Sequence, residues 1–111
     1  MSTILSALTP TSTDLVARLR VLGACSAVAL SNAMQVLDVS RQERLLPSKL
    51  LRGSSGVFVY FSSDHRYAEI ECDDDGDIGI VMSDRSGNPA LWFSQSTRLR
   101  SDLARIRAFL F

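Results

Sequence analysis

The chain has 111 residues, of which 46% are hydrophobic and 22% are charged, a composition typical of one soluble globular domain. Twelve basic and twelve acidic residues give a formal net charge of zero, which removes the simplest electrostatic argument for a protein that binds nucleic acid or a membrane surface. The charges are nevertheless segregated, because residues 53–97 carry an excess of acids while residues 1–52 and 98–111 are basic overall.

Residues 1–52 are predicted to be helical. Thr13 and Asp14 offer side-chain oxygens that can cap a helix start, and apolar residues then recur at helical spacing as far as Leu45, shortly before Pro47. Gly23 interrupts this pattern. The sequence therefore leaves open whether residues 13–45 form one helix or two.

Residues 57–94 are predicted to form a sheet, because the apolar pattern changes to a period of two and the residues become β-branched and aromatic. The four predicted strands are Val57–Phe61, Tyr67–Cys72, Asp77–Met82 and Ala90–Phe93. Short connections rich in turn-forming residues predict an antiparallel meander. Strict alternation gives this sheet one apolar face and one solvated face.

Residues 96–111 are predicted to form a helix that closes the core. Its apolar residues Leu99, Leu103, Ile106 and Leu110 share one side, a stripe suited to packing on a sheet. The predicted fold is a single α+β domain over residues 1–111, with N-terminal helices, a four-stranded antiparallel meander and a C-terminal amphipathic helix packed on one sheet face.

Several short motifs between residues 32 and 111 carry a resemblance to known proteins. They are Asn32-Ala33, Leu45-Leu46-Pro47-Ser48, the strand from Gly56 to Phe61, Tyr67 to Cys72, Ser83-Asp84-Arg85 and Pro89 to Trp92. In these motifs the chain resembles a family of small uncharacterised bacterial proteins often carried on mobile elements. That family has no established activity, so the resemblance implies a genetic context and no chemistry.

Residues able to carry catalysis are few, and we expect a protein that is not an enzyme and uses no cofactor or metal. His65 is the only histidine, and Cys72 lies an odd number of residues from it, so an extended chain directs the two side chains to opposite faces. The chain contains no phosphate-binding glycine loop and no nucleophile elbow. Two cysteines without metal or redox spacing favour a reduced, cytoplasmic protein.

The most conspicuous motif is the acidic turn between the second and third predicted strands. In a calcium loop Glu71, Asp73, Asp75 and Gly76 would match the early ligand positions, but Met82 stands where a bidentate glutamate is required. A solvated hairpin turn explains the same residues. Whether the turn binds a divalent ion stays open at this point.

These features favour a module that binds another protein. Its predicted contact residues are the acidic hairpin, the solvated sheet face and two aromatic residues: Glu69, Glu71, Asp73, Asp74, Asp75, Asp77, Tyr67 and Trp92. Carboxylates displayed in this way could occupy arginines that otherwise hold nucleic acid. An inhibitor of a nucleic-acid-targeting bacterial defence system, resembling an anti-CRISPR protein, and an antitoxin-like partner both fit.

Two further interactions are open on the sequence. A small regulatory nucleic-acid-binding protein would use the arginines of the last helix, Arg98, Arg100, Arg105 and Arg107, although these flank an apolar stripe where arginines commonly extend over a core. In addition, an edge strand such as Ala90 to Phe93 could pair with its copy in a homodimer.

Overall fold

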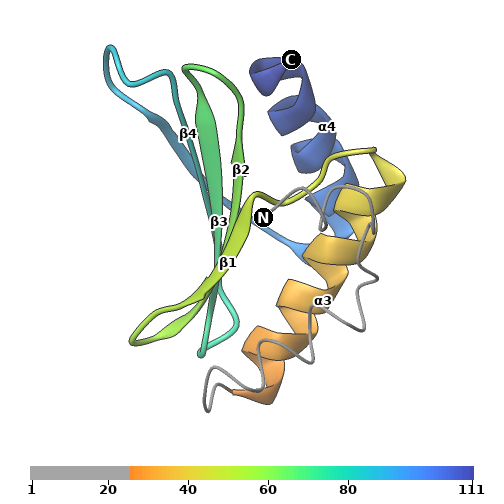
Figure 1. Cartoon of the computed structure of the whole chain (residues 1–111). Helices are drawn as coiled ribbons and strands as arrows, with labels where there is room; N and C mark the ends of the chain where they lie inside the picture. The colour runs from red at the N-terminus through yellow and green to blue at the C-terminus, as the bar shows by residue number, and fades with distance from the viewer. Residues whose placement is uncertain (1–25) are drawn as a thin grey trace, which may run out of the picture.

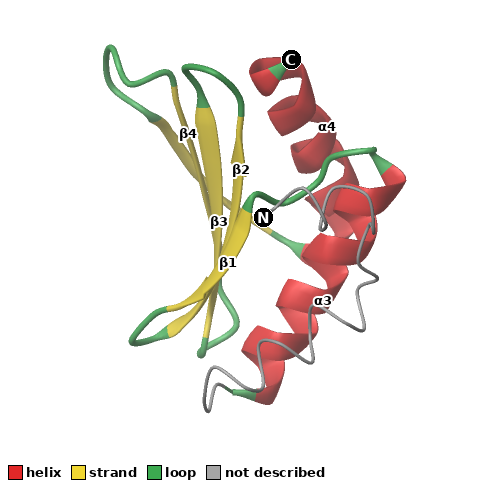
Figure 2. Cartoon of the chain, in the orientation of Figure 1, coloured by secondary structure: helices red, strands yellow, loops and turns green. Residues whose placement is uncertain are grey.

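The computed structural model describes residues 26–111, in which two helices cover one face of a five-stranded antiparallel sheet (Figure 1). The elements are α3 (Ala27–Gln42), β1 (Lys49–Arg52), β2 (Gly56–Ser62), β3 (Tyr67–Asp73), β4 (Ile78–Ser83), β5 (Ala90–Ser94), a single 3-10 turn (Ser96–Arg98) and α4 (Leu99–Leu110). Figure 2 shows both helices on the same side of the sheet. The helix predicted to begin near Thr13 lies outside the described residues. The α+β class and the C-terminal helix on the sheet are confirmed.

The sheet is a meander of five strands in the order β1-β2-β3-β4-β5, so the prediction of four strands was wrong by one. The additional strand, β1, pairs with β2 from Lys49 opposite Tyr60 to Arg52 opposite Val57. It lies between Pro47 and Gly53, at the end of the residues 1–52 that the sequence predicted to be helical. The other four strands match their predicted positions to within a residue or two at each end.

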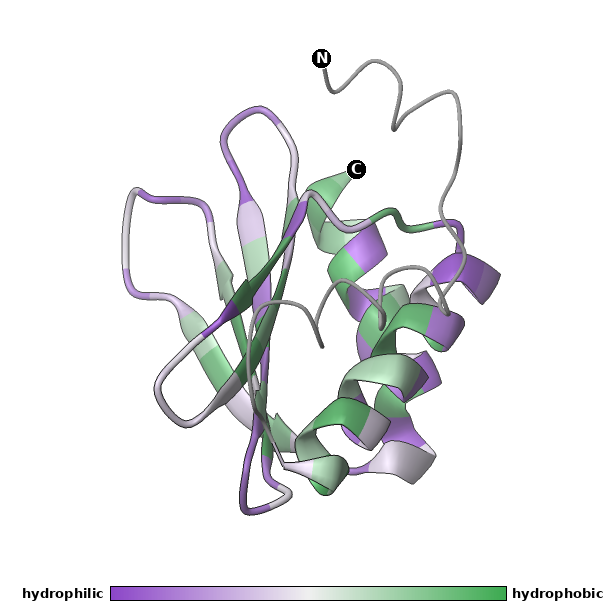
Figure 3. Cartoon of the chain, turned by 60° about the horizontal axis from the view of Figure 1, so that its bottom comes forward, coloured by the Kyte–Doolittle hydropathy of each residue, from purple (hydrophilic) through white to green (hydrophobic). Residues whose placement is uncertain are grey.

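The core lies between the sheet and the two helices. One face of β2, β3 and β4 supplies Val57, Val59, Phe61, Ala68, Ile70, Cys72, Ile78, Ile80 and Met82, all buried. Figure 3 shows hydrophobic colour on strands and helix turns of this packed region, while the loops at the ends of the sheet are mainly hydrophilic. Burial of this apolar surface is the main stabilising contribution to the fold.

Helix α3 has defined caps at both ends. The hydroxyl of Ser26 accepts a hydrogen bond from the Ala29 amide at 3.1 Å, which satisfies one of the free N–H groups of the first turn. At the other end Arg44 adopts a left-handed φ of 59°, and the amides of Arg44 and Leu45 donate to the carbonyls of Arg41 and Ser40. This is a Schellman motif. It ends the helix at Gln42, so the expectation that the helical pattern continues to Leu45 is corrected.

Helix α4 buries the stripe predicted for it. Leu99, Leu103, Ile106 and Leu110 are all at most 5% exposed, and each belongs to the core cluster with α3 and the sheet. Among residues 26–111, no helix combines the length and the apolar character needed to span a lipid bilayer.

Candidate functional site

The face of the sheet opposite the helices, here called the open face, carries two rows of side chains across all five strands. One row contains Leu51, Phe58, Glu71, Gly79 and Phe93, and the next contains Lys49, Tyr60, Glu69, Val81 and Leu91. No helix of the described chain lies on this face (Figure 1). Leu51, Leu91 and Phe93 are 44%, 73% and 74% exposed. Both outer strands therefore display apolar side chains, and the middle strand displays carboxylates.

The carboxylates on β3 are crowded. Glu69, Glu71 and Asp73 follow one another at every second position of one strand, which places them on the same face. Burial, a hydrogen bond to Asp73 and the negative charges of Asp73, Glu69 and Asp75 together raise the pKa of Glu71 to about 7. Burial and the neighbouring carboxylates thus act on this pKa in the same direction, and Glu71 lies in a crowded, negatively charged row.

Two tyrosines and two cations form one end of the open face. The ammonium of Lys49 lies 4.8 Å from the ring centre of Tyr60, and the guanidinium of Arg85 lies 5.4 Å from the ring centre of Tyr67. With Glu69 these side chains line a shallow hollow of about 320 Å³. Burial and a hydrogen bond to Glu69 raise the pKa of Tyr60. The open face is thus mixed in charge at this end and acidic at the other.

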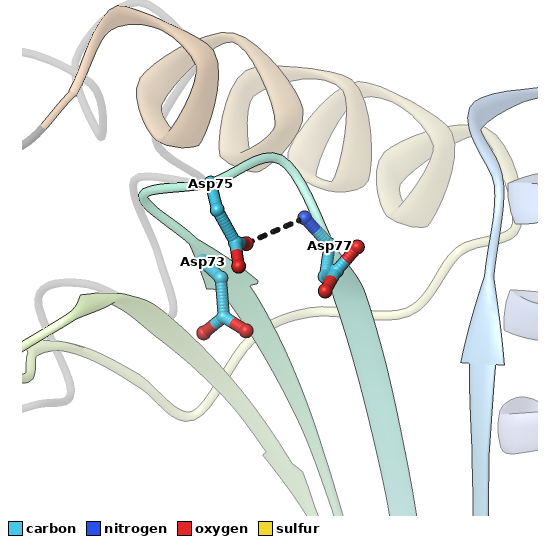
Figure 4. A group of neighbouring side chains, drawn as sticks. All are labelled: Asp73, Asp75 and Asp77. Atoms are coloured by element: carbon cyan, nitrogen blue, oxygen red, sulfur yellow. Dashed lines mark hydrogen bonds between the residues drawn. The ribbon is translucent and has the colours of Figure 1, made fainter.

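The acidic end is the hairpin between β3 and β4. Asp73, Asp75 and Asp77 bring one carboxylate oxygen each within 4.8 Å of one another (Figure 4). A carboxylate oxygen of Asp75 accepts the Asp77 amide at 3.1 Å, an Asx turn that explains an aspartate at this position. Gly76 has a φ of 102°, which explains the glycine. Such oxygen ligands suit a hard cation such as Ca²⁺, but the same contacts belong to an ordinary tight turn.

Asp74 differs from the other aspartates of the hairpin because it forms hydrogen bonds with Ser26 at the start of α3. Its carboxylate accepts the Ser26 amide at 2.9 Å, and its carbonyl accepts the Ser26 hydroxyl at 3.0 Å. The Asp74 amide donates to the Ser55 carbonyl, and the Asn32 side chain donates to the Gly76 carbonyl. The hairpin is therefore fastened to the start of α3, and Asp74 is not a freely displayed charge.

Trp92 does not lie on the same face as Tyr67, which corrects its prediction as a contact residue beside Tyr67. Its position in β5 is opposite Ile80, so its side chain lies on the face that the helices cover. The indole N–H donates to the buried carboxylate of Asp102 at 3.1 Å, and the Ser94 hydroxyl donates to the other oxygen of the same carboxylate. Trp92 joins β5 to α4 and is removed from the candidate contact residues.

The arginines of α4 do not form one continuous basic surface. The Arg105 guanidinium lies 4.2 Å from the centre of the Trp92 ring, and Arg100 forms an ion pair with Glu43 of the α3 C-cap at 3.1 Å. Arg98 and Arg107 are exposed at opposite ends of the helix. Two of the four residues predicted for nucleic-acid binding thus already have partners within the domain.

The histidine and cysteine are far from forming a catalytic pair. His65 is exposed in the turn between β2 and β3, whereas Cys72 is buried in the core with no exposed surface. Burial raises the pKa of the Cys72 thiol to about 12, so this thiol stays protonated at neutral pH and is a poor nucleophile.

The open face therefore unites Tyr67, Glu69, Glu71 and Asp73 as the sequence predicted, and it adds apolar residues that the sequence did not suggest. Leu51 was missed because β1 was missed. Leu91 and Phe93 were missed because four consecutive apolar residues, Ala90 to Phe93, show no alternation of their own. Their face follows only from the register with β4.

No family model, curated protein or solved structure matches this chain. The resemblance to small proteins of mobile elements thus remains a prediction.

Proposed function

We propose that this chain is a non-catalytic module that binds another protein through its open face. The observation that carries the proposal is the uncovered face itself, on which exposed apolar side chains at both sheet edges flank a crowded row of carboxylates. Exposed apolar patches bordered by polar residues mark interaction sites. Aromatic residues such as Phe58, Tyr60 and Phe93 are enriched in the buried parts of protein interfaces.

The partner follows from the chemistry of this face. A surface with arginine or lysine side chains set between apolar ones would cover Leu91 and Phe93 and place a cation beside Glu69 and Glu71. A cation there would lower the raised pKa of Glu71, so binding releases a proton and strengthens as the pH rises through about 7. Charge-assisted contacts to arginine are stronger than neutral hydrogen bonds.

The acidic hairpin contributes to this surface through Asp73, Asp75 and Asp77, while Asp74 serves the fold. A basic surface is what proteins that hold nucleic acid present. The most specific form of the proposal is therefore an inhibitor that occupies the nucleic-acid-binding arginines of a bacterial defence protein, in the manner of an anti-CRISPR protein or an antitoxin.

The test compares three immobilised forms of the full chain in a lysate of the source organism, with and without nuclease treatment. The first is the native chain, the second carries Glu69→Gln and Glu71→Gln, and the third is a charge-matched control with Asp38→Asn and Asp64→Asn on α3 and the β2–β3 turn. We expect a protein retained at stoichiometric level by the native chain and the control, and about tenfold less by the open-face variant.

Two results would contradict the proposal. Equal retention by all three forms would place the contact elsewhere. Retention that nuclease abolishes, together with a steep loss of binding to isolated DNA or RNA as salt rises, would favour the arginines of α4 instead.

A further inference from the structure

The two outer strands of the sheet differ in how their free edges are protected. Edge strands that expose unpaired backbone groups are commonly protected by charged side chains. Strand β1 contains Lys49 and Arg52, one at each end. Strand β5, by contrast, has the sequence Ala-Leu-Trp-Phe-Ser without any charged residue. Within residues 26–111 its outer edge faces no other strand.

The side chains of β5 on the open face are the most exposed apolar groups of the sheet. Leu91 and Phe93 are 73% and 74% exposed. The Phe93 ring extends over Gly79 of the neighbouring strand, where a side-chain carbon on the glycine would lie 3.8 Å from it. Strand β5 is therefore an uncharged edge with exposed apolar side chains, the kind that pairs with another strand.

We propose that β5 pairs antiparallel with β5 of a second copy of this chain, which joins the two sheets into one of ten strands. Pairing of all five residues about a two-fold axis places Trp92 opposite Trp92 of the copy, and Leu91 opposite Phe93 of the copy. These last two pairs lie on the open face. Pairs of an aromatic and an aliphatic residue directly across two antiparallel strands stabilise a sheet.

Pairing of β5 with its copy is favoured over pairing of β1 with its copy, because β5 has no charged residues and β1 has two. The equivalent full register of β1 with its copy would place Lys49 opposite Arg52 of the copy, and like charges in that position destabilise a strand pair. Full pairing of β5 opposes no two charged residues, with Ala90 opposite Ser94 at the ends. The resulting dimer would also join two open faces side by side with the apolar residues of β5 in the centre.

The contact is short, because five residues pair on each side. Interfaces of this size are below the standard class, so we expect monomer and dimer to exchange with a dissociation constant on the order of 10 to 100 µM. The dimer pairs the backbone edge of β5, whereas the proposed partner covers the open face. Both contacts include the side chains of Leu91 and Phe93, but only the partner uses the carboxylates of Glu69 and Glu71, so variants of these carboxylates distinguish the two proposals.

The experiment measures the mass of the full chain by sedimentation across protein concentrations from about 1 µM to about 1 mM, with two variants of matched charge. Phe93→Lys places a cation in the pairing edge, whereas Leu51→Lys places the same cation on the opposite edge of the same face. We expect the native chain and Leu51→Lys to dimerise alike, and Phe93→Lys to dimerise at least about tenfold more weakly. Leu91→Lys serves as a second edge variant if Phe93→Lys does not fold.

Two copies could also associate by stacking their open faces, and Phe93→Lys would weaken that contact as well. Amide hydrogen exchange distinguishes such stacking from pairing at the edge of β5. Pairing at the edge slows the exchange of outward-pointing β5 amides as protein concentration increases, while stacking leaves them unchanged. The single tryptophan, Trp92, gives a parallel readout through a concentration-dependent emission shift. A monomer at all concentrations, equal association of the Leu51 and Phe93 variants, or exchange independent of concentration would each overturn the proposal. The variant with Glu69→Gln and Glu71→Gln should dimerise as tightly as the native chain, because the dimer does not use these carboxylates.

Discussion

At the level of single residues, Asp74 shows how a carboxylate in an acidic turn can belong to the fold. It accepts the Ser26 amide at the start of α3, where a negative charge also interacts favourably with the helix dipole. We expect Asp74→Ala to lower the free energy of unfolding by about 1 to 2 kcal/mol, and Asp74→Asn, which keeps an acceptor oxygen, to lower it by less. Urea denaturation measures both.

Asp77→Ala is the matched control for this prediction, since Asp77 is exposed in the same hairpin. Its free energy of unfolding should change by no more than about 0.5 kcal/mol. If the Asp74 and Asp77 variants were equally stable, the fastening of the hairpin to α3 would contribute nothing, and Asp74 would return to the candidate contact surface.

The sequence predicted the positions of some residues of the candidate site and not of others. Alternation within β3 was enough to place Tyr67, Glu69 and Glu71 together, because that strand has apolar and polar residues in strict turn. It could not place Trp92, since β5 is apolar at four successive positions and its face depends on a register set by β4. Nor could it separate Asp74 from its neighbours, because the contact with Ser26 joins residues 48 positions apart.

At the level of elements, the end of α3 depends on a residue that is poorly suited to its backbone. Arg44 has a φ of 59°, a left-handed conformation that glycine adopts without steric cost. We expect Arg44→Gly to raise the free energy of unfolding by about 0.5 to 1 kcal/mol. Arg41→Gly, inside the last helical turn, should lower it by about 1 kcal/mol. Thermal denaturation of both variants checks the pair, and destabilisation by Arg44→Gly would contradict the strain at this position.

This cap also explains why the predicted helix was too long. The sequence has no glycine or asparagine at the end of α3, so the usual stop signal was lacking, and Leu45 continued the apolar spacing. The structure buries Leu45 to 2% exposure outside the helix, where it belongs to the core. Strand β1 was missed for a related reason, because four residues are too few to show a period of two.

At the level of the whole molecule, the segregation of charge along the chain becomes a segregation in space. The acidic middle segment forms β2 to β5, and six of its eight carboxylates lie on the open face or in the β3–β4 hairpin, away from the arginines of α4. Two ion pairs between described residues, Arg41 with Asp38 and Arg100 with Glu43, lie on the helical side. Negative charges thus crowd at Glu71, an arrangement that costs stability and that a cation supplied by a partner would relieve.

This cost makes stability depend on pH in a predictable direction. Because folding raises the pKa of Glu71 from 4.5 to about 7, the folded chain holds a proton between these values that the unfolded chain has released. The free energy of unfolding therefore falls as the pH rises from about 4.5 to about 7 and levels off above it. Glu71→Gln removes this contribution. We expect the variant to match the native chain near pH 4 and to exceed its stability by about 1 kcal/mol at pH 8, after allowance for solvent screening.

Urea denaturation at several pH values measures the difference, with Asp64→Asn as a control that removes an exposed carboxylate from the β2–β3 turn. The control should follow the native curve in slope, because its side chain lies outside the crowded row. Parallel curves for Glu71→Gln and the native chain would mean that the carboxylates of β3 do not repel one another in the folded state. The charge argument for a basic partner would then lose its basis, while the apolar edge at Leu91 and Phe93 would remain as an independent site of association.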